Sequence, residues 1–362
     1  MEDARRHYLD LIRHDGVTLS PELARAFATV PREVFVPDGF HRRDGRLVLP
    51  ADPEYLRAVY SNDVLVTKLS GNRPISSSSQ PSLMALMIEA LDVRPGQRIL
   101  EIGAGTGYNA ALLATLGAAV TTVEVQEDVA DRARSALARA AINGVRVENA
   151  DGYTGGPAGD YDRIIVTVGV AGISPYWTGR LLPGGRIVAP VEHAGMHPVL
   201  SVDTGGEVTV ICPAGFMSAA GPLTARHPGS HPPPPSEPLT GLDTVVPARW
   251  ETTLEALAYR DLWFAAGVWH RRVTYASVPG REQSLIAVLD EDGPGSAVVL
   301  PDGAVLASAD RCAAVALALA DRWWAMGRPP MRAWRATLAS AGGPVLVPGP
   351  WRLTRPRDPG HP

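Results

Sequence analysis

The segment with the clearest chemistry is a glycine-rich turn, Glu101–Gly107, which reads EIGAGTG. It follows an apolar run and precedes a helical pattern, and Gly103, Gly105 and Gly107 allow the backbone to turn sharply and a ligand to approach it closely. In open α/β sheets, ligands bind outside the carboxyl ends of the strands, where such a turn would lie. A dinucleotide-binding fingerprint would require a glycine at the position of Tyr108, so the ligand is of another kind.

Three acidic residues, each at the end of a predicted strand, indicate which ligand the turn holds. S-adenosylmethionine carries a positively charged sulfur and an amino acid head but no pyrophosphate, so a glycine turn with Glu101 nearby, directly or through water, suits it. We expect Glu124 to accept both ribose hydroxyls and Asp151 to meet the adenine amino group. The sequence therefore predicts an S-adenosylmethionine site, with S-adenosylhomocysteine as the product, completed by Val125, Gly152 and Thr167.

The composition is that of a soluble globular protein, with 362 residues of which 45% are hydrophobic and 20% charged. A net charge of −4 provides no basic field for nucleic acid. Cys212 and Cys312 lie far apart without a Cys/His cluster, so we expect no metal site. The charged N-terminus does not resemble a signal peptide, and no segment reaches about 20 consecutive apolar residues. We expect a cytoplasmic protein that binds neither membranes nor nucleic acid.

The elements that must position the site alternate between strand and helix along the first part of the chain. Apolar, β-branched runs predict strands, and amphipathic patterns between them predict helices; the strands are expected at 98–102, 119–125, 144–149 and 161–170, and the helices at 82–91, 109–116 and 127–141. Two further strands, 197–203 and 207–212, are expected to form a hairpin. This alternation predicts an α/β fold with a doubly wound, mostly parallel sheet.

A proline-rich segment, residues 227–240, separates this region from a second one. Proline favours the extended polyproline II conformation, so the segment is predicted to be a semi-rigid linker. We expect a first domain over 1–226, a smaller α+β domain over 241–345 and a tail over 346–362. Within the second domain, short strand patterns lie between residues 272 and 307, and a helix is expected at 332–341.

Seven of the eight tryptophans follow the linker. Tryptophan is enriched at binding hot spots, so we expect a peptide-docking face in this domain, although each indole taken singly is better explained as core. The residues concerned are Trp250, Trp263, Trp269, Trp323, Trp324, Trp334 and Trp351.

Over residues 19–218 the chain resembles the protein-L-isoaspartate O-methyltransferases, which have a class I methyltransferase fold. The matching stretches, in order, are VPREVFVP, YSNDVL, SQPSLMALMIEAL, LEIGAGTGYNAALLA, ADGYTG, YDRIIVTVGV, LLPGGRIVAPV and AGFMSA. The glycine motif alone would not point to this family. The resemblance rests on the order and spacing of all eight stretches.

The resemblance implies an active-site serine before the SQP turn, at the position of Ser79, with Ser78 and Asp63 as further catalytic candidates. It also implies that an acceptor peptide contacts Asn62, Gln80 and the segment formed by Phe216, Met217 and Ser218. A carboxylate is already ionised at pH 7, so its methylation requires alignment rather than a strong base. The following backbone nitrogen attacks the carbonyl carbon of the resulting methyl ester and displaces methanol, which closes an aspartimide that hydrolyses to aspartate or isoaspartate.

Two features depart from the family. The run Ile75–Ser79 reads ISSSS where a Thr-Ile-Ser type is usual, and it is either a loose helix cap or a remodelled acceptor site. The extension after the linker resembles the branch of the family that modifies ribosomally made peptides such as lanthipeptides, graspetides and lasso peptides. We therefore expect methylation of one aspartate in a precursor peptide. The alternatives are general repair of isoaspartyl proteins and a noncatalytic cofactor-binding regulator, and the protein is expected to be a monomer or a homodimer.

Overall fold

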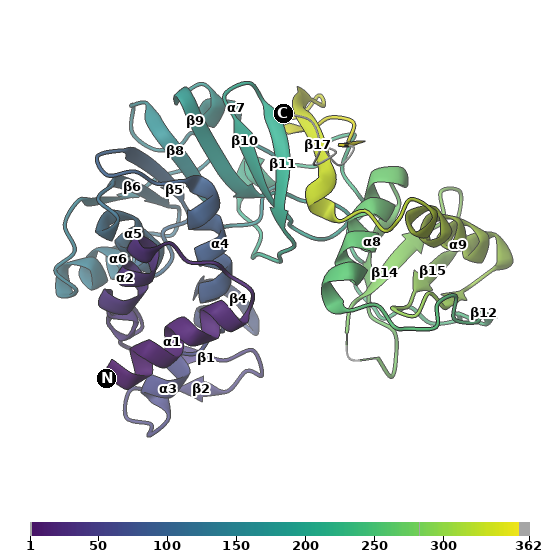
Figure 1. Ribbon diagram of the computed structural model, residues 1–362, viewed down its shortest axis with the longest axis horizontal. Coiled ribbons are helices and arrows are strands. Elements are labelled where there is room, and N and C mark those ends of the chain that lie inside the picture. Colours follow the sequence, from purple (N-terminus) through teal and green to yellow (C-terminus); the bar gives the residue numbers. More distant parts are fainter. Residues whose placement is uncertain (1, 282, 355–362) are drawn as a thin grey trace, which may run out of the picture.

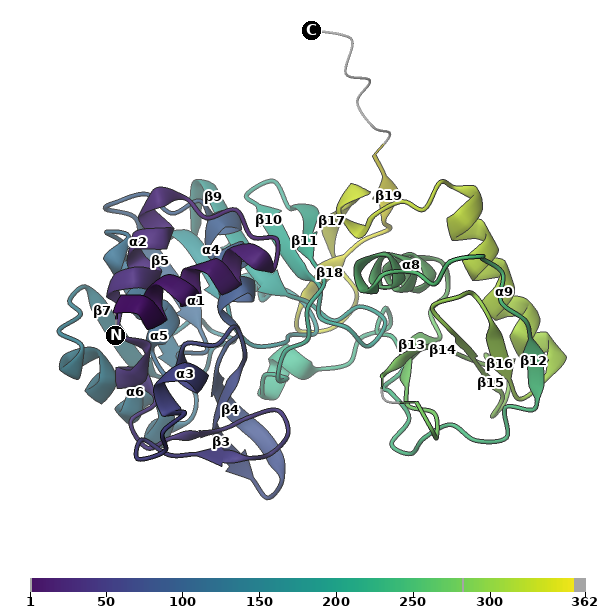
Figure 2. The same ribbon diagram turned by 60° about the horizontal axis from the view of Figure 1, so that its bottom comes forward.

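A computed structural model describes residues 2–281 and 283–354 and shows two lobes of unequal size (Figure 1). The larger lobe holds the N-terminal half of the chain around a central sheet, and the smaller lobe holds the segment between about residues 240 and 330. The last strands of the chain return from the smaller lobe to the edge of the central sheet (Figures 1 and 2). No helix in these described stretches is long and apolar enough to cross a membrane.

The central sheet has ten strands, in the order β18-β17-β11-β10-β9-β8-β5-β6-β7, with β19 paired to β17. Neighbouring strands from β7 to β9 are parallel, and those from β9 to β17 are antiparallel. The predicted doubly wound, mostly parallel sheet is therefore confirmed. Its strands are β5 (Arg98–Ile102), β6 (Ala119–Glu124), β7 (Val145–Asn149), β8 (Tyr161–Val166), β9 (Leu181–Pro190), β10 (Val199–Asp203) and β11 (Glu207–Cys212).

Three helices, α4, α5 and α6, pack buried apolar side chains against strands of this sheet. Pro81 begins α4, where its missing N–H costs no hydrogen bond, and α4 contacts β8 through β11. The larger lobe contains α1 (Glu2–His14), α2 (Pro21–Thr29), η1 (Arg32–Phe35), α3 (Tyr55–Val59), α4 (Pro81–Leu91), α5 (Tyr108–Thr115), α6 (Glu127–Arg139), α7 (Pro175–Thr178) and η2 (Gly221–Thr224).

A separate four-stranded sheet of order β2-β1-β3-β4 lies near the N-terminal helices (Figure 2). Its strands β3 and β4 form an antiparallel hairpin that ends at the predicted catalytic serines. The strands are β1 (Phe40–His41), β2 (Leu47–Val48), β3 (Leu65–Ser70) and β4 (Arg73–Ser78).

The smaller lobe is a five-stranded antiparallel sheet of order β12-β16-β15-β14-β13, packed against α8 and α9. Its strands are short and nearly all buried, in agreement with the short strand patterns in the sequence. The elements are β12 (Thr244–Val246), α8 (Ala256–Trp269), β13 (Val273–Ala276), β14 (Leu285–Leu289), β15 (Ser296–Val299), β16 (Val305–Ala307), α9 (Asp310–Ala325) and η3 (Met331–Ala333).

The prediction of a helix at 332–341 is wrong, because the segment forms β17 (Trp334–Ser340) and pairs with β11. Strands β18 (Leu346–Pro348) and β19 (Arg352–Leu353) pair with β17 in turn. Residues 334–353 thus extend the central sheet, which differs from the expected division at 241–345 and 346–362. Residues 355–362 of the expected tail lie outside the described residues.

The tryptophans do not form a shared docking face. Trp250, Trp263, Trp323 and Trp334 are buried, and Trp269 and Trp351 are half-buried. Trp324 is exposed over 41% of its surface and stacks on Trp250, with ring centroids 5.0 Å apart. The indoles mainly supply the core of the smaller lobe and its junction with the central sheet, so their number does not itself indicate peptide binding.

Candidate active site

The glycine turn lies between β5 and α5, at the carboxyl end of the parallel strands. Gly103 has a φ of +97°, and a β-carbon there would stand 2.8 Å from Thr167 Oγ1. Gly105 has a φ of +52°, and its β-carbon would stand 3.1 Å from the carbonyl oxygen of Ser77. Thr167 fixes the start of the turn by donating a hydrogen bond of 2.6 Å to the Gly103 carbonyl. Backbone conformation and space together therefore require glycine at both positions.

Glu124 ends β6 beside this turn. Its carboxylate accepts hydrogen bonds of 3.1 Å from the backbone N–H groups of Gly105 and Gln126. Burial raises the pKa of Glu124, and these backbone donors oppose that rise. The next side chain, Val125, is 58% exposed, which leaves an apolar surface at the strand end. A carboxylate beside an apolar side chain suits a ribose and its base.

The segment after β7 is tied to the end of β6. Asn149 donates a hydrogen bond of 2.9 Å to the Glu124 carbonyl, and Asp151 accepts one of 2.9 Å from the N–H of Tyr153. Gly152 is buried, and a β-carbon there would stand 2.7 Å from Ile102 Cγ2. The exposed carboxylate of Asp151 therefore lies at the same sheet edge as Glu124.

The Glu101 carboxylate, which we expected near the ligand, is held by neighbouring protein groups. Its side chain is fully buried, and its two oxygens accept hydrogen bonds of 2.6 Å from Asn109 Nδ2 and Thr122 Oγ1. Burial, opposed by these two donors, raises its pKa to about 7. Glu101 therefore stabilises the glycine turn, because its two hydrogen bonds connect the first turn of α5 to β6.

The serine run shows a strand alternation that separates its hydroxyls. Ser76 and Ser78 are buried, whereas Ser77 and Ser79 are half-exposed, as expected for side chains that point to opposite faces. Ser78 Oγ has no hydrogen-bond partner among the described residues. The half-exposed face carries Ser79, and Ser77 on the same face lies against Gly105. Ser79 is therefore the candidate catalytic serine, and the catalytic role expected for Ser78 does not fit its orientation.

Arg32, which the sequence analysis did not select, holds this serine in place. Its guanidinium is fully buried and donates hydrogen bonds of 3.0 Å to the carbonyls of Asp63 and Ser79, and further ones to Val59 and Ser61. The rings of Tyr8 and Tyr108 flank it, each 5.8 Å from Cζ. Its position in the stretch VPREVFVP was the only signal for it in the sequence.

The remaining acceptor-site candidates form a polar network around α4. Asn62 accepts a hydrogen bond of 3.0 Å from the Ser82 N–H, while Gln80 donates one of 3.1 Å to Ser82 Oγ. Asp63 is paired with Arg43 at 2.6 Å. All three side chains are only partly buried and converge near the start of α4, next to Ser79.

The segment with Phe216, Met217 and Ser218 approaches the same sheet edge. The Met217 carbonyl accepts a hydrogen bond of 2.8 Å from the Gly169 N–H, and Ser218 forms a bridge with Gly169. Gly169 follows β8 just after Thr167, so this segment lies at the carboxyl end of β8. The expected acceptor residues therefore flank the cofactor residues on two sides.

These residues fit S-adenosylmethionine. The turn has no β-carbon at its three glycines, Glu124 lies at the strand end, and Val125 is an exposed apolar side chain. Gly103, Gly105 and Thr167 would hold the amino acid part, with Glu124 on the ribose and Asp151 on the base.

Comparisons with known proteins show the family to which the chain belongs. The chain matches the family described as protein-L-isoaspartate(D-aspartate) O-methyltransferase over residues 3–213. Protein-L-isoaspartate O-methyltransferase 1 of Anaeromyxobacter sp. is 34% identical over 208 residues, which are 56% of this chain and 89% of that relative. The protein-L-isoaspartate O-methyltransferase of Gloeobacter violaceus is 34% identical over 224 residues, which are 61% of this chain and 98% of that relative.

The likeness in fold extends beyond the first lobe. A solved structure described as a protein-L-isoaspartate O-methyltransferase aligns with 97% of this chain and 99% of its own, with a TM-score of 0.55 and 24% identity. Because the family match covers more than half of the sequence, the chain belongs to the protein-L-isoaspartate(D-aspartate) O-methyltransferase family and is an S-adenosylmethionine-dependent methyltransferase.

Proposed function

We propose that this enzyme methylates the side-chain carboxylate of an aspartyl or isoaspartyl residue within a polypeptide. The observation that carries the proposal is the contact between the serine strand and the cofactor turn. The Ser77 carbonyl lies only 3.1 Å from where a β-carbon of Gly105 would be, so Ser79, two residues later, lies close to the bound cofactor. A hydroxyl at this position is suited to hold an acceptor carboxylate or its neighbouring amide.

When bound, S-adenosylmethionine supplies a methyl group on a positively charged sulfur. An acceptor carboxylate with a pKa near 4 is already ionised at neutral pH, so the protein's part is to orient it rather than to deprotonate it. Ser79 would donate a hydrogen bond to the acceptor, and Arg32 fixes Ser79 through its carbonyl.

We also propose a narrower function, the tailoring of one aspartate in a ribosomally made precursor peptide, with aspartimide and then isoaspartate as products. The four-serine run supports this narrower function. It departs from the family's usual sequence at the acceptor strand, and such a departure is compatible with a different acceptor. The second lobe does not distinguish this function from protein repair, since a solved protein described as an isoaspartate methyltransferase aligns with nearly the whole chain. Peptide recognition by the second lobe remains a proposal.

The deciding assay compares two acceptors with S-adenosylmethionine: a short isoaspartyl peptide, and L-aspartyl precursor peptides encoded near the gene. Methylation of an L-aspartyl precursor followed by loss of 18 Da relative to the unmodified peptide would support tailoring. Efficient turnover of the isoaspartyl peptide, with no L-aspartyl precursor modified, would establish repair instead.

The serine assignment has its own test. Ser79→Ala is expected to lower kcat by about 100-fold, an effect typical of a group that aligns reactants, while affinity for S-adenosylhomocysteine stays the same. Ser78→Ala is expected to retain activity, because the Ser78 hydroxyl has no partner among the described residues. Equal loss in both variants would contradict the proposed role of Ser79.

A further inference from the structure

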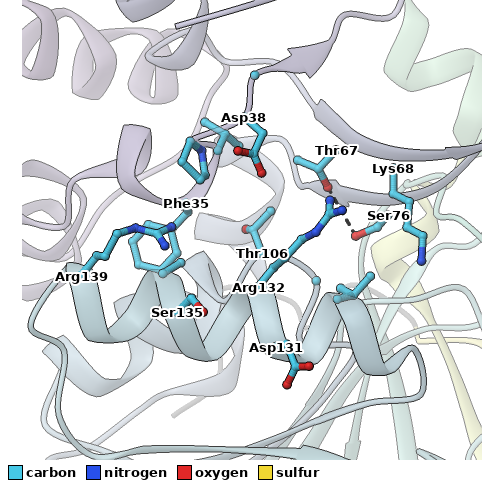
Figure 3. Close-up of a pocket in the computed structure, with 16 residues that line it drawn as sticks. Phe35, Asp38, Thr67, Lys68, Ser76, Thr106, Asp131, Arg132, Ser135 and Arg139 are labelled. Carbon is cyan, nitrogen blue, oxygen red and sulfur yellow. Dashed lines mark hydrogen bonds between the residues drawn. The ribbon is translucent and has the colours of Figure 1, made fainter.

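A cavity of about 430 Å³ lies between the β3–β4 hairpin, α6 and the loop that follows η1 (Figure 3). Its apolar lining comes from buried side chains, namely Phe35, Val36, Val129 and Ala136. Of the residues predicted to hold the cofactor, only Gly105 lines this cavity. The cavity therefore adjoins the cofactor turn but is a separate space, with the volume and apolar lining typical of a ligand site.

One wall of the cavity carries a set of hydrogen-bond donors. Arg132 extends from α6 toward Thr67 and Ser76 on the hairpin (Figure 3). Thr67 Oγ1 donates to Ser76 Oγ at 3.4 Å, which leaves the Ser76 hydroxyl free to donate. Within residues 2–281 and 283–354, the guanidinium of Arg132 makes no hydrogen bond or ion pair. A guanidinium beside hydroxyl groups is the donor set that recognises a carboxylate.

Most other charged side chains around the cavity already have a hydrogen-bond or ion-pair partner. Lys68 Nζ lies 2.6 Å from Asp128 and 2.9 Å from Gln126 Oε1. Arg139 donates to the Val34 carbonyl. Asp131 is paired with Arg134 and points away from the cavity in Figure 3. Among the described cations at the cavity, Arg132 is thus the one whose side chain makes neither a hydrogen bond nor an ion pair, and Asp128 attracts it only at longer range.

A carboxylate also lines the cavity, and Figure 3 shows it near Thr67. Asp38, on the loop after η1, makes no hydrogen bond or ion pair with any described residue. It would repel a second acidic group, so the charge distribution favours a single carboxylate held on the Arg132 side.

We propose that this cavity is a carboxylate-binding site for an acidic side chain of the polypeptide acceptor. The proposal rests on the proposed function and specifies its substrate. Ser76, which lines the cavity, precedes Ser79 by three residues, a span of about 10 Å along a strand. An extended acceptor spans the same distance in three residues. A glutamate three positions from the methylated residue would contact the apolar lining with its methylene groups and Arg132 with its carboxylate.

The first test uses acceptor peptides that carry glutamate or glutamine three residues before or after the methylated position. The glutamate peptide is expected to show a KM about tenfold lower, with kcat unchanged, because the site contributes binding rather than chemistry. Arg132→Glu should reverse this preference in favour of an arginine peptide. Arg25→Glu, an exposed substitution on α2 outside the cavity, is the control and should keep the preference for glutamate. Equal KM values for the glutamate and glutamine peptides would overturn the proposal.

A second test does not depend on turnover. Lys68 is the only lysine in the sequence and lies at the cavity with its side chain 26% exposed, so an amine-reactive reagent followed by mass spectrometry reports on occupancy. The glutamate peptide should slow Lys68 labelling at least fivefold and the glutamine peptide should not. Equal protection by both, or by N-acetylglutamate at the same concentration, would overturn a peptide site. Protection without any methylation would refute the proposed function while supporting the cavity as a binding site.

Discussion

Two ionisable side chains, Arg32 and Glu101, lie completely buried beneath the site and hold its parts together. Arg32 joins three carbonyls of residues 59–63 to that of Ser79, so it fixes the acceptor side. Glu101 links α5 to β6 and so fixes the cofactor side. Neither side chain needs to touch a reactant, because each acts through the backbone or side chains that it positions.

Removing the Arg32 guanidinium should lower both the free energy of unfolding and kcat. In Arg32→Met, one buried and three partly buried carbonyls lose their donor, so the free energy of unfolding should fall by about 3 kcal/mol. Urea unfolding measures this loss. The folded fraction should show a reduced kcat with unchanged affinity for S-adenosylhomocysteine, whereas Arg25→Met should change neither quantity. A variant that loses only stability would show that Arg32 does not position Ser79.

The burial of Glu101 predicts an unusual pH dependence of the free energy of unfolding. Its folded pKa of about 7 exceeds the ordinary value of 4.5, so folding favours the protonated carboxyl group. Its contribution to stability is therefore present at low pH and is lost as the pH rises from about 4.5 through 7. Glu101→Gln should be more stable than the wild type at pH 8 by about 1–3 kcal/mol, and similar to it at pH 4.5. Urea unfolding at the two pH values measures this, with the exposed Glu127→Gln as control. Equal pH dependence in the wild type and Glu101→Gln would contradict the assignment.

For single residues, the sequence predicted those positions at which the fold constrains the spacing along the chain. The glycine spacing located the turn because only glycine fits at Gly103 and Gly105, and the family resemblance located Ser79. Neither could reveal that the Glu101 carboxylate is occupied by Thr122 and Asn109, since that depends on packing between strand and helix. A buried arginine such as Arg32 leaves no periodic pattern.

Among the elements, β17 departs furthest from expectation. The stretch 332–341 reads RAWRATLASA and is rich in alanine and arginine, which favour helices. Pairing with β11 overrides this preference, because it buries Trp334 and Ala336 against the central sheet. Strands β5 to β8 were predictable because their apolar runs are flanked by strong helical patterns. The pairing of β17 with β11 was not predictable, because β17 is an isolated short strand far along the chain from its partner.

A proline in β17 tests this pairing. The Leu338 N–H donates a hydrogen bond of 2.8 Å to the Gly206 carbonyl, which Leu338→Pro removes. The free energy of unfolding should fall by about 3 kcal/mol, and amide exchange in β10 and β11 should accelerate. Leu338→Ile retains the N–H group and should leave exchange unchanged. Unaltered protection of β11 in the proline variant would show that β17 contributes little to the central sheet.

In the whole molecule, the two lobes meet through buried polar contacts. His193 Nε2 donates to the Phe264 carbonyl at 2.9 Å, and Trp263 Nε1 donates to the Ala194 carbonyl at 2.9 Å. The His231 ring, from the proline-rich segment, lies 5.0 Å from that of His193. Burial, together with the neighbouring His231, lowers the pKa of His193 to about 3, and burial lowers that of His231 to about 4.

These histidines predict that acid loosens the contact between the lobes. Their folded pKa values lie below 6.5, so the stability they provide is present above pH 6.5 and is lost as the pH falls toward 4. Amide exchange in α8, measured at pH 7 and pH 5 and corrected for intrinsic rates, should show lower protection at pH 5. His193→Gln keeps a donor for the Phe264 carbonyl but does not titrate, so the loss of protection in α8 between pH 7 and pH 5 should become smaller. Nearby Glu192, whose pKa burial raises to about 7, contributes in the opposite direction, and Glu192→Gln isolates the histidine effect.

The return of β17 to the central sheet also has a consequence for biosynthesis. The smaller lobe is inserted between two adjacent strands of one sheet, since β11 ends at residue 212 and its neighbour β17 begins at residue 334. A nascent chain therefore cannot complete the catalytic lobe until more than 120 further residues have left the ribosome. Until then the edge of β11 stays open, and chaperone binding during translation would be concentrated on this strand.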